Sequence, residues 1–162
     1  MRQYNNGKVQ SQYSELNNPI TDIEVQTAIK ELKTGKASGG DMLLNELYIC
    51  GLDSLLPKLT SLFNLIFASS HFPTSWKNGI IIALFKKGDK CDVNNYRGIT
   101  LLSTLGKLFT KILNNRLVFW SDTYNIITDT QAGFRKGRST VDNIFIIQSI
   151  IDSSLGKEKK VY

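Results

Sequence analysis

The chain has 162 residues, 41% of them hydrophobic, and a formal net charge of +6 at pH 7. This length is sufficient for one hydrophobic core and hardly for two independent domains. No apolar run approaches the roughly 20 residues that span a bilayer, and no apolar segment follows Arg2, so we expect a soluble, intracellular protein that is neither secreted nor bound to a membrane.

The first predicted elements are two helices joined by a turn. Residues 1–20 are polar and rich in Asn and Gln, which predicts a loose leader. Thr21–Glu24 has the form of a capping box, and apolar residues follow at helical spacing, so a short amphipathic helix begins there. Lys33–Asp41 is rich in glycine and lysine and predicts a turn, after which Met42–Cys50 predicts a second helix.

A longer helix and a strand follow. The helix is expected to begin near Asp53 or Ser54, to tolerate Pro57 in its first turn and to end at His71. Its predicted buried face comprises Leu59, Leu62, Phe63, Ile66 and Phe67. Gly79–Phe85 is short, apolar and rich in isoleucine, which predicts a strand buried on both faces.

Two further helices complete the predicted secondary structure. One follows Ser103 and is expected to bury Leu105, Leu108, Phe109, Ile112, Leu113 and Leu117, with Lys107, Lys111 and Arg116 facing away. The last begins at Ser139 or Thr140 and is expected to bury Ile144, Ile147, Ile151 and Leu155. These elements predict an α+β fold that is mostly helical, with one or two strands.

Positive charge is concentrated in one stretch of the chain. Between Trp76 and Arg138, eleven Lys or Arg residues stand against four Asp, a balance of +7. Such a segment is typical of proteins that contact phosphates, although a solvated basic surface is the alternative. Cys50, Cys91 and His71 are too widely scattered to indicate a metal site.

The strongest candidate site precedes the last helix. Arg135, Lys136 and Arg138 lie between Gly133 and Ser139, directly before the predicted helix start. Glycines allow backbone N–H groups to approach an anion, the helix N-terminus adds partial positive charge, and guanidinium groups bind phosphate in a bidentate manner. The alternative is an ordinary basic turn in which Ser139 or Thr140 only caps the helix.

A second candidate site lies after the predicted strand. The strand leads into Lys86 and Lys87, and the chain then returns with Arg97. This hairpin-like arrangement would allow lysine and arginine side chains to hold a triphosphate between them. The alternative is an exposed connection with unrelated charges.

Three ordered runs closely resemble the fingers-region blocks of reverse transcriptases from non-LTR (LINE-like) retrotransposons: Leu84–Asp89, Asn94–Leu117 and Gln131–Thr140. Lys33–Glu46 resembles an extra block that these enzymes carry ahead of the fingers. The resemblance covers roughly residues 20–162. Ser38, Gly40 and Gly98 depart from it, because the family usually or frequently has proline at these positions.

The resemblance implies a fold and roles for individual residues. It implies a leader (1–20), a helical N-terminal extension (21–78) and a partial right-hand polymerase domain (79–162) that contains the fingers and an incomplete palm. Lys86 or Lys87 and Arg97 would contact the triphosphate of the incoming nucleotide. The template-binding residues would be Gly133, Phe134, Arg135, Lys136, Arg138 and Ser139. The partners would be an RNA template, a DNA primer and dNTPs, and the family's usual compartment is the nucleus.

The catalytic carboxylates of the family have no counterpart in this sequence. The family polymerises with Mg²⁺ ions held by an Asp on the strand after the last helix and by a later Asp-Asp pair, and the chain contains no Asp-Asp pair. We therefore expect a reverse-transcriptase fragment without catalytic residues, metal site or polymerase activity of its own. The alternatives are a non-catalytic basic domain that binds RNA or DNA and a helical interaction module with incidental charge.

Overall fold

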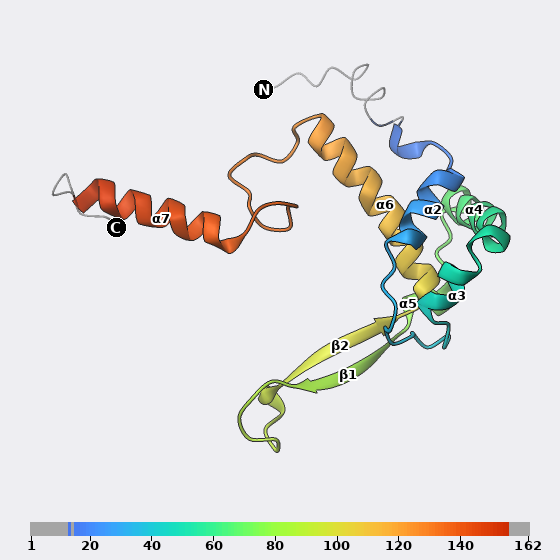
Figure 1. The fold of residues 1–162 in the computed structure, drawn as a ribbon, viewed down its shortest axis with the longest axis horizontal. Coiled ribbons are helices and arrows are strands. Elements are labelled where there is room, and N and C mark those ends of the chain that lie inside the picture. The colour runs from blue at the N-terminus through green and yellow to red at the C-terminus, as the bar shows by residue number, and fades with distance from the viewer. Residues whose placement is uncertain (1–12, 14, 156–162) are drawn as a thin grey trace. The chain divides into compact units, whose positions relative to one another are not determined.

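The computed structural model describes residue 13 and residues 15–155, which form two compact units divided between Val118 and Phe119. The first unit contains η1 (Glu15–Asn17), α2 (Asp22–Lys30), α3 (Asn45–Cys50), α4 (Leu52–Ser69), α5 (Thr74–Lys77), β1 (Gly79–Phe85), η2 (Val93–Asn95), β2 (Tyr96–Leu102) and most of α6 (Thr104–Thr123). The second contains the end of α6 and α7 (Thr140–Leu155) (Figure 1). The α+β class, mostly helical, is confirmed.

The predicted capping box at the start of α2 is confirmed. The Thr21 hydroxyl accepts a hydrogen bond from the Glu24 N–H at 3.3 Å, and the Glu24 carboxylate accepts one from the Thr21 N–H at 2.8 Å. The helix predicted over Met42–Cys50 is too long, since α3 begins only at Asn45. Met42 adopts a left-handed φ of 56°, which no α-helix tolerates, and the Asp41 carboxylate accepts the Leu43 N–H at 3.2 Å.

The core of the first unit lies between α2, α3, α4, α5 and α6. The buried face predicted for α4 is confirmed, because Leu59, Phe63 and Ile66 are buried while Leu62 and Phe67 pack partly against the core. Aromatic rings fill its centre, where Phe63, Phe72 and Trp76 each contact another ring with centroids 5.6–6.2 Å apart. Edge-to-face and tilted pairs of this kind add stabilisation beyond the buried area.

The predicted faces of α6 are correct for the core and wrong at two positions. Leu108, Phe109 and Ile112 are buried as expected, whereas Leu117 is exposed. Arg116 does not face away from the protein, because its side chain is only 11% exposed. A guanidinium group can be buried where its donors all find acceptors, and the folded chain supplies those acceptors.

Arg116 binds α2 and the segment before it. Its Nε and Nη2 atoms lie 2.5 and 2.9 Å from the two carboxylate oxygens of Glu24. Nη1 donates to the Asn18 carbonyl at 2.5 Å and Nη2 to the Pro19 carbonyl at 2.9 Å, while the guanidinium carbon lies 5.7 Å from the centre of the Phe67 ring on α4. One side chain therefore connects α6, α2, α4 and the chain that precedes α2.

The predicted leader, residues 1–20, falls partly outside the described residues, which omit 1–12 and 14. In the part that is described, Ile20 is buried and its N–H donates to the side chain of Asn64 at 2.7 Å. The Asn64 amide in turn donates to the Ile20 carbonyl at 2.8 Å. The chain is therefore fixed against α4 directly before α2 begins.

Two antiparallel strands, β1 and β2, form the sheet. They run side by side, with Gly79 opposite Leu102 and Phe85 opposite Tyr96 (Figure 1). The strand predicted at Gly79–Phe85 is confirmed, but its predicted burial on both faces is wrong, because every residue of β1 is exposed. Within the described part of the chain, no further layer covers either face of this two-stranded ribbon.

In the second unit, the predicted start of α7 at Thr140 is confirmed and its predicted buried face is wrong. Ile144 and Ile147 are 63% and 58% exposed, Ile151 is half-buried, and the side chain of Leu155 lies outside the described residues. The apolar residues recur at helical spacing as expected, but nothing in the described part of this unit covers them. No helix among the described residues is long and apolar enough to cross a membrane.

Replacing Arg116 by methionine should lower the free energy of unfolding by about 3 kcal/mol, because Glu24 and the carbonyls of Asn18 and Pro19 lose their donors. Urea denaturation followed by circular dichroism measures the loss. Lys111→Met is the matched control, since it removes an exposed ion pair between α6 and Glu31 (Nζ–Oε2 2.9 Å), which should be worth less than about 1 kcal/mol. Equal losses in the two variants would contradict the role given to Arg116.

The same pair of variants can be compared at low pH. The Arg116 hydrogen bonds lower the pKa of Glu24 from 4.5 to about 2, with a further contribution from Thr21. Because the pKa is depressed in the folded state, the stabilisation is complete above the unfolded value of 4.5 and is lost as pH falls from there towards 2. Arg116→Met should therefore lose less stability in this pH window than Lys111→Met does.

Candidate nucleic-acid interface

The hairpin turn, residues 86–95, carries the first group of predicted site residues. The Lys86 N–H donates to the Asn95 carbonyl at 2.8 Å, which continues the ladder beyond the pair of Phe85 and Tyr96. Arg97 stands opposite Leu84, and side chains alternate between the two faces of a strand. Lys86 and Arg97 therefore share one face at the end of the ribbon.

The opposite face of the ribbon end is aromatic. The rings of Phe85 and Tyr96 lie 5.4 Å apart, and the Lys90 Nζ is 5.9 Å from the centre of the Phe85 ring. The Tyr96 hydroxyl donates to the Lys90 carbonyl at 3.0 Å, which holds the turn against this face. Lys90 is thus associated with the aromatic pair and separated from the face of Lys86 and Arg97.

Acidic residues in the hairpin turn bond to backbone N–H groups. The Asp89 carboxylate accepts the Cys91 N–H and the Asp92 carboxylate accepts the Asn94 N–H, each at 2.9 Å. Such Asx turns are a common way for aspartate to stabilise a tight loop. Lys86, Lys87 and Arg97 are exposed, and among the described residues none of the three forms an ion pair. These cations are therefore available to an anion from solution.

The base of the ribbon is fixed by the glycine- and lysine-rich turn that precedes α3. The Ser103 hydroxyl donates to the Asp41 carboxylate at 2.6 Å, and the buried Thr104 hydroxyl lies 3.2 Å from the Asn45 side-chain oxygen. Gly39 packs directly on the end of β2, where an added Cβ would lie 2.5 Å from the carbonyl of Leu102. These contacts attach the base of the ribbon to α6 and to the turn before α3.

The same turn is attached to α3 by Glu46 and Asn45. The Glu46 carboxylate accepts the Gly35 N–H at 2.6 Å, which lowers the pKa of Glu46, and the Asn45 amide donates to the Lys33 carbonyl at 2.8 Å. Gly35 has a φ of +66°, a conformation that glycine adopts without steric cost. The turn is therefore a structural connection between α2, α3 and the ribbon base.

The basic loop, residues 128–139 of the second unit, carries the other predicted site residues. Arg135 donates to the Thr128 carbonyl at 3.1 Å and lies 3.5 Å from the Asp129 carboxylate. Arg138 lies 3.2 Å from the same Asp129 oxygen. Lys136 is exposed and has no ion pair among the described residues.

Asp129 was not among the residues predicted from the sequence. The available signal was a lone carboxylate several residues before a cluster of three cations, but spacing in a loop does not show which groups meet. The structure brings Arg135 and Arg138 together on one carboxylate oxygen.

The start of α7 shows the capping arrangement that stood as the alternative at the sequence level. The Ser139 hydroxyl accepts the Val141 N–H at 3.2 Å, and the Asp142 carboxylate accepts the Ser139 N–H at 2.7 Å. The side chains of Ser139, directly before α7, and of Asp142, in its first turn, thus satisfy these two backbone donors. These two N–H groups are therefore not available to a phosphate.

The tip of the basic loop presents an aromatic ring. Phe134 is fully exposed and has a φ of 60°, which is strained for a residue of its size. Gly137 follows with a φ of +79°, and an added Cβ at Gly133 would meet no atom within 4 Å. An open, cation-flanked ring of this kind can stack on a flat ligand.

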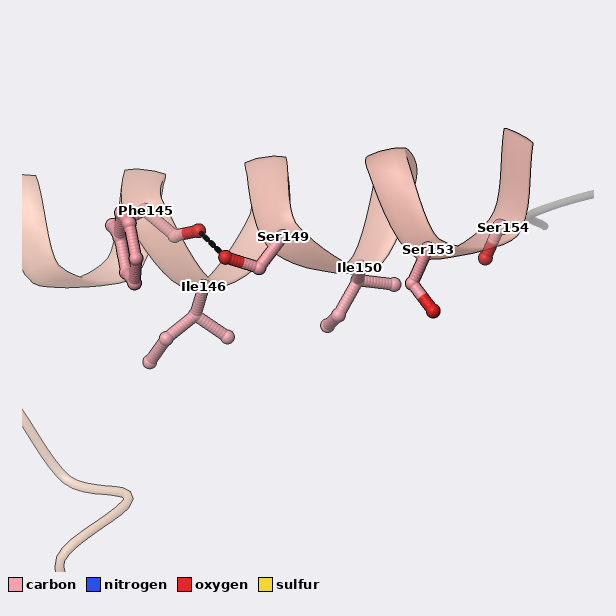
Figure 2. A pocket seen from close by; sticks show the side chains of 6 residues that line it. All are labelled: Phe145, Ile146, Ser149, Ile150, Ser153 and Ser154. Atoms are coloured by element: carbon pink, nitrogen blue, oxygen red, sulfur yellow. Dashed lines mark hydrogen bonds between the residues drawn. The ribbon is translucent and has the colours of Figure 1, made fainter. Parts of the chain in front are cut away.

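One other place could hold a ligand, and it does not bear on the predicted chemistry. A shallow hollow of about 430 Å³ lies on α7 and is lined by Phe145, Ile146, Ser149, Ile150, Ser153 and Ser154 (Figure 2). It contains no charged side chain and belongs to one helix. Among the described residues no three His, Cys, Asp or Glu side chains are grouped to bind a metal, so this part of the chain does not fit the Mg²⁺ that the resemblance implies.

Comparison with known proteins supports the resemblance stated from the sequence. No protein-family model matches the chain. It is 32% identical over 144 residues to the RNA-directed DNA polymerase from mobile element jockey of Drosophila melanogaster, covering 88% of this chain and 16% of that protein. The protein of the same name from Drosophila funebris is 32% identical over 145 residues, covering 89% and 16%. The probable RNA-directed DNA polymerase from transposon BS of Drosophila melanogaster is 34% identical over 127 residues, covering 78% and 14%.

The chain therefore resembles non-LTR retrotransposon RNA-directed DNA polymerases over most of its length. It spans 16% of the length of the first of these relatives, so the similarity concerns one segment of a much larger protein. The matched segment contains both the ribbon and the helices that support it.

Replacing Gly39 by alanine should lower the free energy of unfolding by about 2 kcal/mol, because the new methyl group would collide with the backbone of Leu102 and Ser103. Thermal unfolding followed by circular dichroism measures the change. Gly40→Ala is the matched control, since its nearest neighbour would be the Ile80 Cδ1 at 3.9 Å, and the expected change is within about 0.5 kcal/mol. If both variants melted like the unmodified chain, the close contact at Gly39 would be disproved.

Proposed function

We propose that this chain is the segment of a non-LTR retrotransposon reverse transcriptase that contacts the phosphates of the template and of the incoming nucleotide. The observation that carries the proposal is the similarity of most of the chain to RNA-directed DNA polymerases. The local geometry supports it, because both loops that match the family's blocks present cationic side chains to solvent.

In this proposal the hairpin turn holds the triphosphate of a dNTP. Lys86 and Arg97 share one face of the ribbon end and carry no internal ion pair among the described residues. A triphosphate carries several negative charges within a few ångströms. Two cations on one face would therefore bind a triphosphate more tightly than they would bind a single phosphate group. The exposed Lys87 adds charge in the same turn.

The basic loop would bind the template strand. Arg135, Lys136 and Arg138 provide cations for backbone phosphates, and the exposed ring of Phe134 lies beside them in the chain. Proteins that bind single strands combine cations along the backbone with aromatic rings on which bases stack. This combination favours an unpaired template nucleotide as the ligand of the loop.

For a protein that contains this segment we propose RNA-templated DNA synthesis, with an RNA template, a DNA primer and dNTPs as partners. The side chains described here would bind and orient phosphates. Bound Mg²⁺ would supply charge neutralisation at the reacting phosphate, and the carboxylates for it are not grouped among the described residues. The contribution of this segment is therefore positioning, which accounts for a large part of catalysis in phosphoryl and nucleotidyl transfer.

The chain should bind an RNA–DNA primer-template with a steep salt dependence, and the triple variant Arg135→Ala, Lys136→Ala, Arg138→Ala should weaken binding and flatten the slope. Each lost phosphate contact should reduce the slope of log K against log salt by roughly 0.7–0.9. Fluorescence anisotropy across a salt series measures both quantities.

The control for this experiment changes net charge equally and leaves the basic loop intact. Lys30, Lys33 and Lys58 are exposed residues of the first unit, and their triple alanine variant also removes three positive charges. It should retain most of the affinity and slope. If the two triple variants behaved alike, binding would depend on overall charge and the role of the basic loop would be refuted.

Removing Lys86 and Arg97 together by alanine substitution should weaken binding of a dNTP by about tenfold or more, because charge-assisted hydrogen bonds each contribute 1.5–3 kcal/mol. Titration calorimetry with dTTP and with thymidine monophosphate measures the effect, which should be larger for the triphosphate. Lys90→Ala is the control, since Lys90 lies against Phe85 on the other face of the ribbon. A loss of the same size in Lys90→Ala would argue against the assigned face.

A further inference from the structure

The basic loop contains its own anion. One carboxylate oxygen of Asp129 lies 3.5 Å from Arg135 and 3.2 Å from Arg138, so both guanidinium groups converge on a single acceptor. Two arginines on one oxygen atom is also the arrangement in which they would bind a phosphate oxygen. The carboxylate thus occupies the position that the proposed ligand needs.

The ion pairs made by Asp129 are suited to displacement. The Asp129 side chain is 89% exposed, and exposed ion pairs contribute little to stability because water screens them. Arg135 has a second anchor, since it donates to the Thr128 carbonyl at 3.1 Å and its side chain is only 21% exposed. The Arg135 guanidinium can therefore stay in place when the carboxylate leaves.

We propose that Asp129 is a built-in competitor of nucleic-acid phosphate at the basic loop. This inference rests on the proposed template-binding function of the loop and assigns that site a regulating residue. A phosphate group displaces the Asp129 carboxylate from Arg135 and Arg138. Because this displacement breaks two ion pairs, a ligand binds only if it makes several contacts with the loop at once. A strand that places successive phosphates on Arg135, Lys136 and Arg138 satisfies this condition, and an isolated phosphate ion does not.

A positioning role for Asp129 makes the opposite prediction. If the carboxylate served to hold the two arginines in a binding geometry, its removal would loosen them and weaken nucleic-acid binding. Competition instead predicts tighter binding when the carboxylate is neutralised. The sign of one affinity change therefore separates the two roles.

The test compares Asp129→Asn with Asp122→Asn, using anisotropy of a fluorescein-labelled uridine RNA homopolymer across a salt series. Both variants raise the net charge by one, and Asp122 is an exposed residue of the same unit without an ion pair among the described residues. Asp129→Asn should bind about two- to tenfold more tightly than Asp122→Asn and with a steeper salt slope, since two guanidinium groups lose a competing partner. Affinity of Asp129→Asn equal to or below that of Asp122→Asn would overturn the inference.

A second comparison separates failure of this inference from failure of the proposed function. In a background with Arg135→Ala and Arg138→Ala, the Asp129→Asn change should have no greater effect than Asp122→Asn, because no guanidinium remains to be released. If the unmodified chain bound RNA and the loss of both arginines did not weaken binding, the proposed function of the loop would fail. If the arginines mattered but Asp129→Asn gave no gain over Asp122→Asn, only the competition would fail.

Discussion

The first unit depends on how Arg116 is satisfied. A guanidinium group with an 11% exposed side chain must find acceptors for its donors, and it finds them on Glu24 and on the carbonyls of the chain before α2. Because Glu24 also forms the capping box with Thr21, the same carboxylate starts α2 and fixes α6 beside it. A lysine could not do this, since a single ammonium group lacks the planar fork that reaches both carboxylate oxygens.

The ribbon of β1 and β2 is attached at its base to the helical part of the first unit, and its far end is exposed to solvent. At the base, Gly39 and the bond between Asp41 and Ser103 hold the end of β2 against the turn before α3. At the far end the aspartates bond to backbone N–H groups, so they stabilise the turn without neutralising Lys86 or Arg97. A fixed base with unpaired charge at the exposed end is a suitable arrangement for a phosphate-binding element, because among the described residues these cations have no ion pair to give up on binding.

The basic loop differs from the hairpin turn because its arginines have an internal ion-pair partner. Its arginines converge on Asp129, whereas the hairpin turn leaves its cations without an internal acid. The helix that follows the basic loop exposes large apolar residues, including Ile144, Phe145 and Ile147. Exposed apolar surface of that extent is characteristic of a face that packs against other protein.

Local pattern in the sequence determined the elements and the residue types of both loops. The buried face of α4 follows from helical periodicity, the capping box at Thr21 from the residue types at its two ends, and the strand at Gly79–Phe85 from a short apolar run rich in isoleucine. Only the tertiary structure decided that β1 is exposed, that Arg116 points inward and that Asp129 joins two arginines. Arg116 and Glu24 lie 92 residues apart, and no local pattern encodes which distant acceptors surround a charged group or whether a second layer covers an apolar strand.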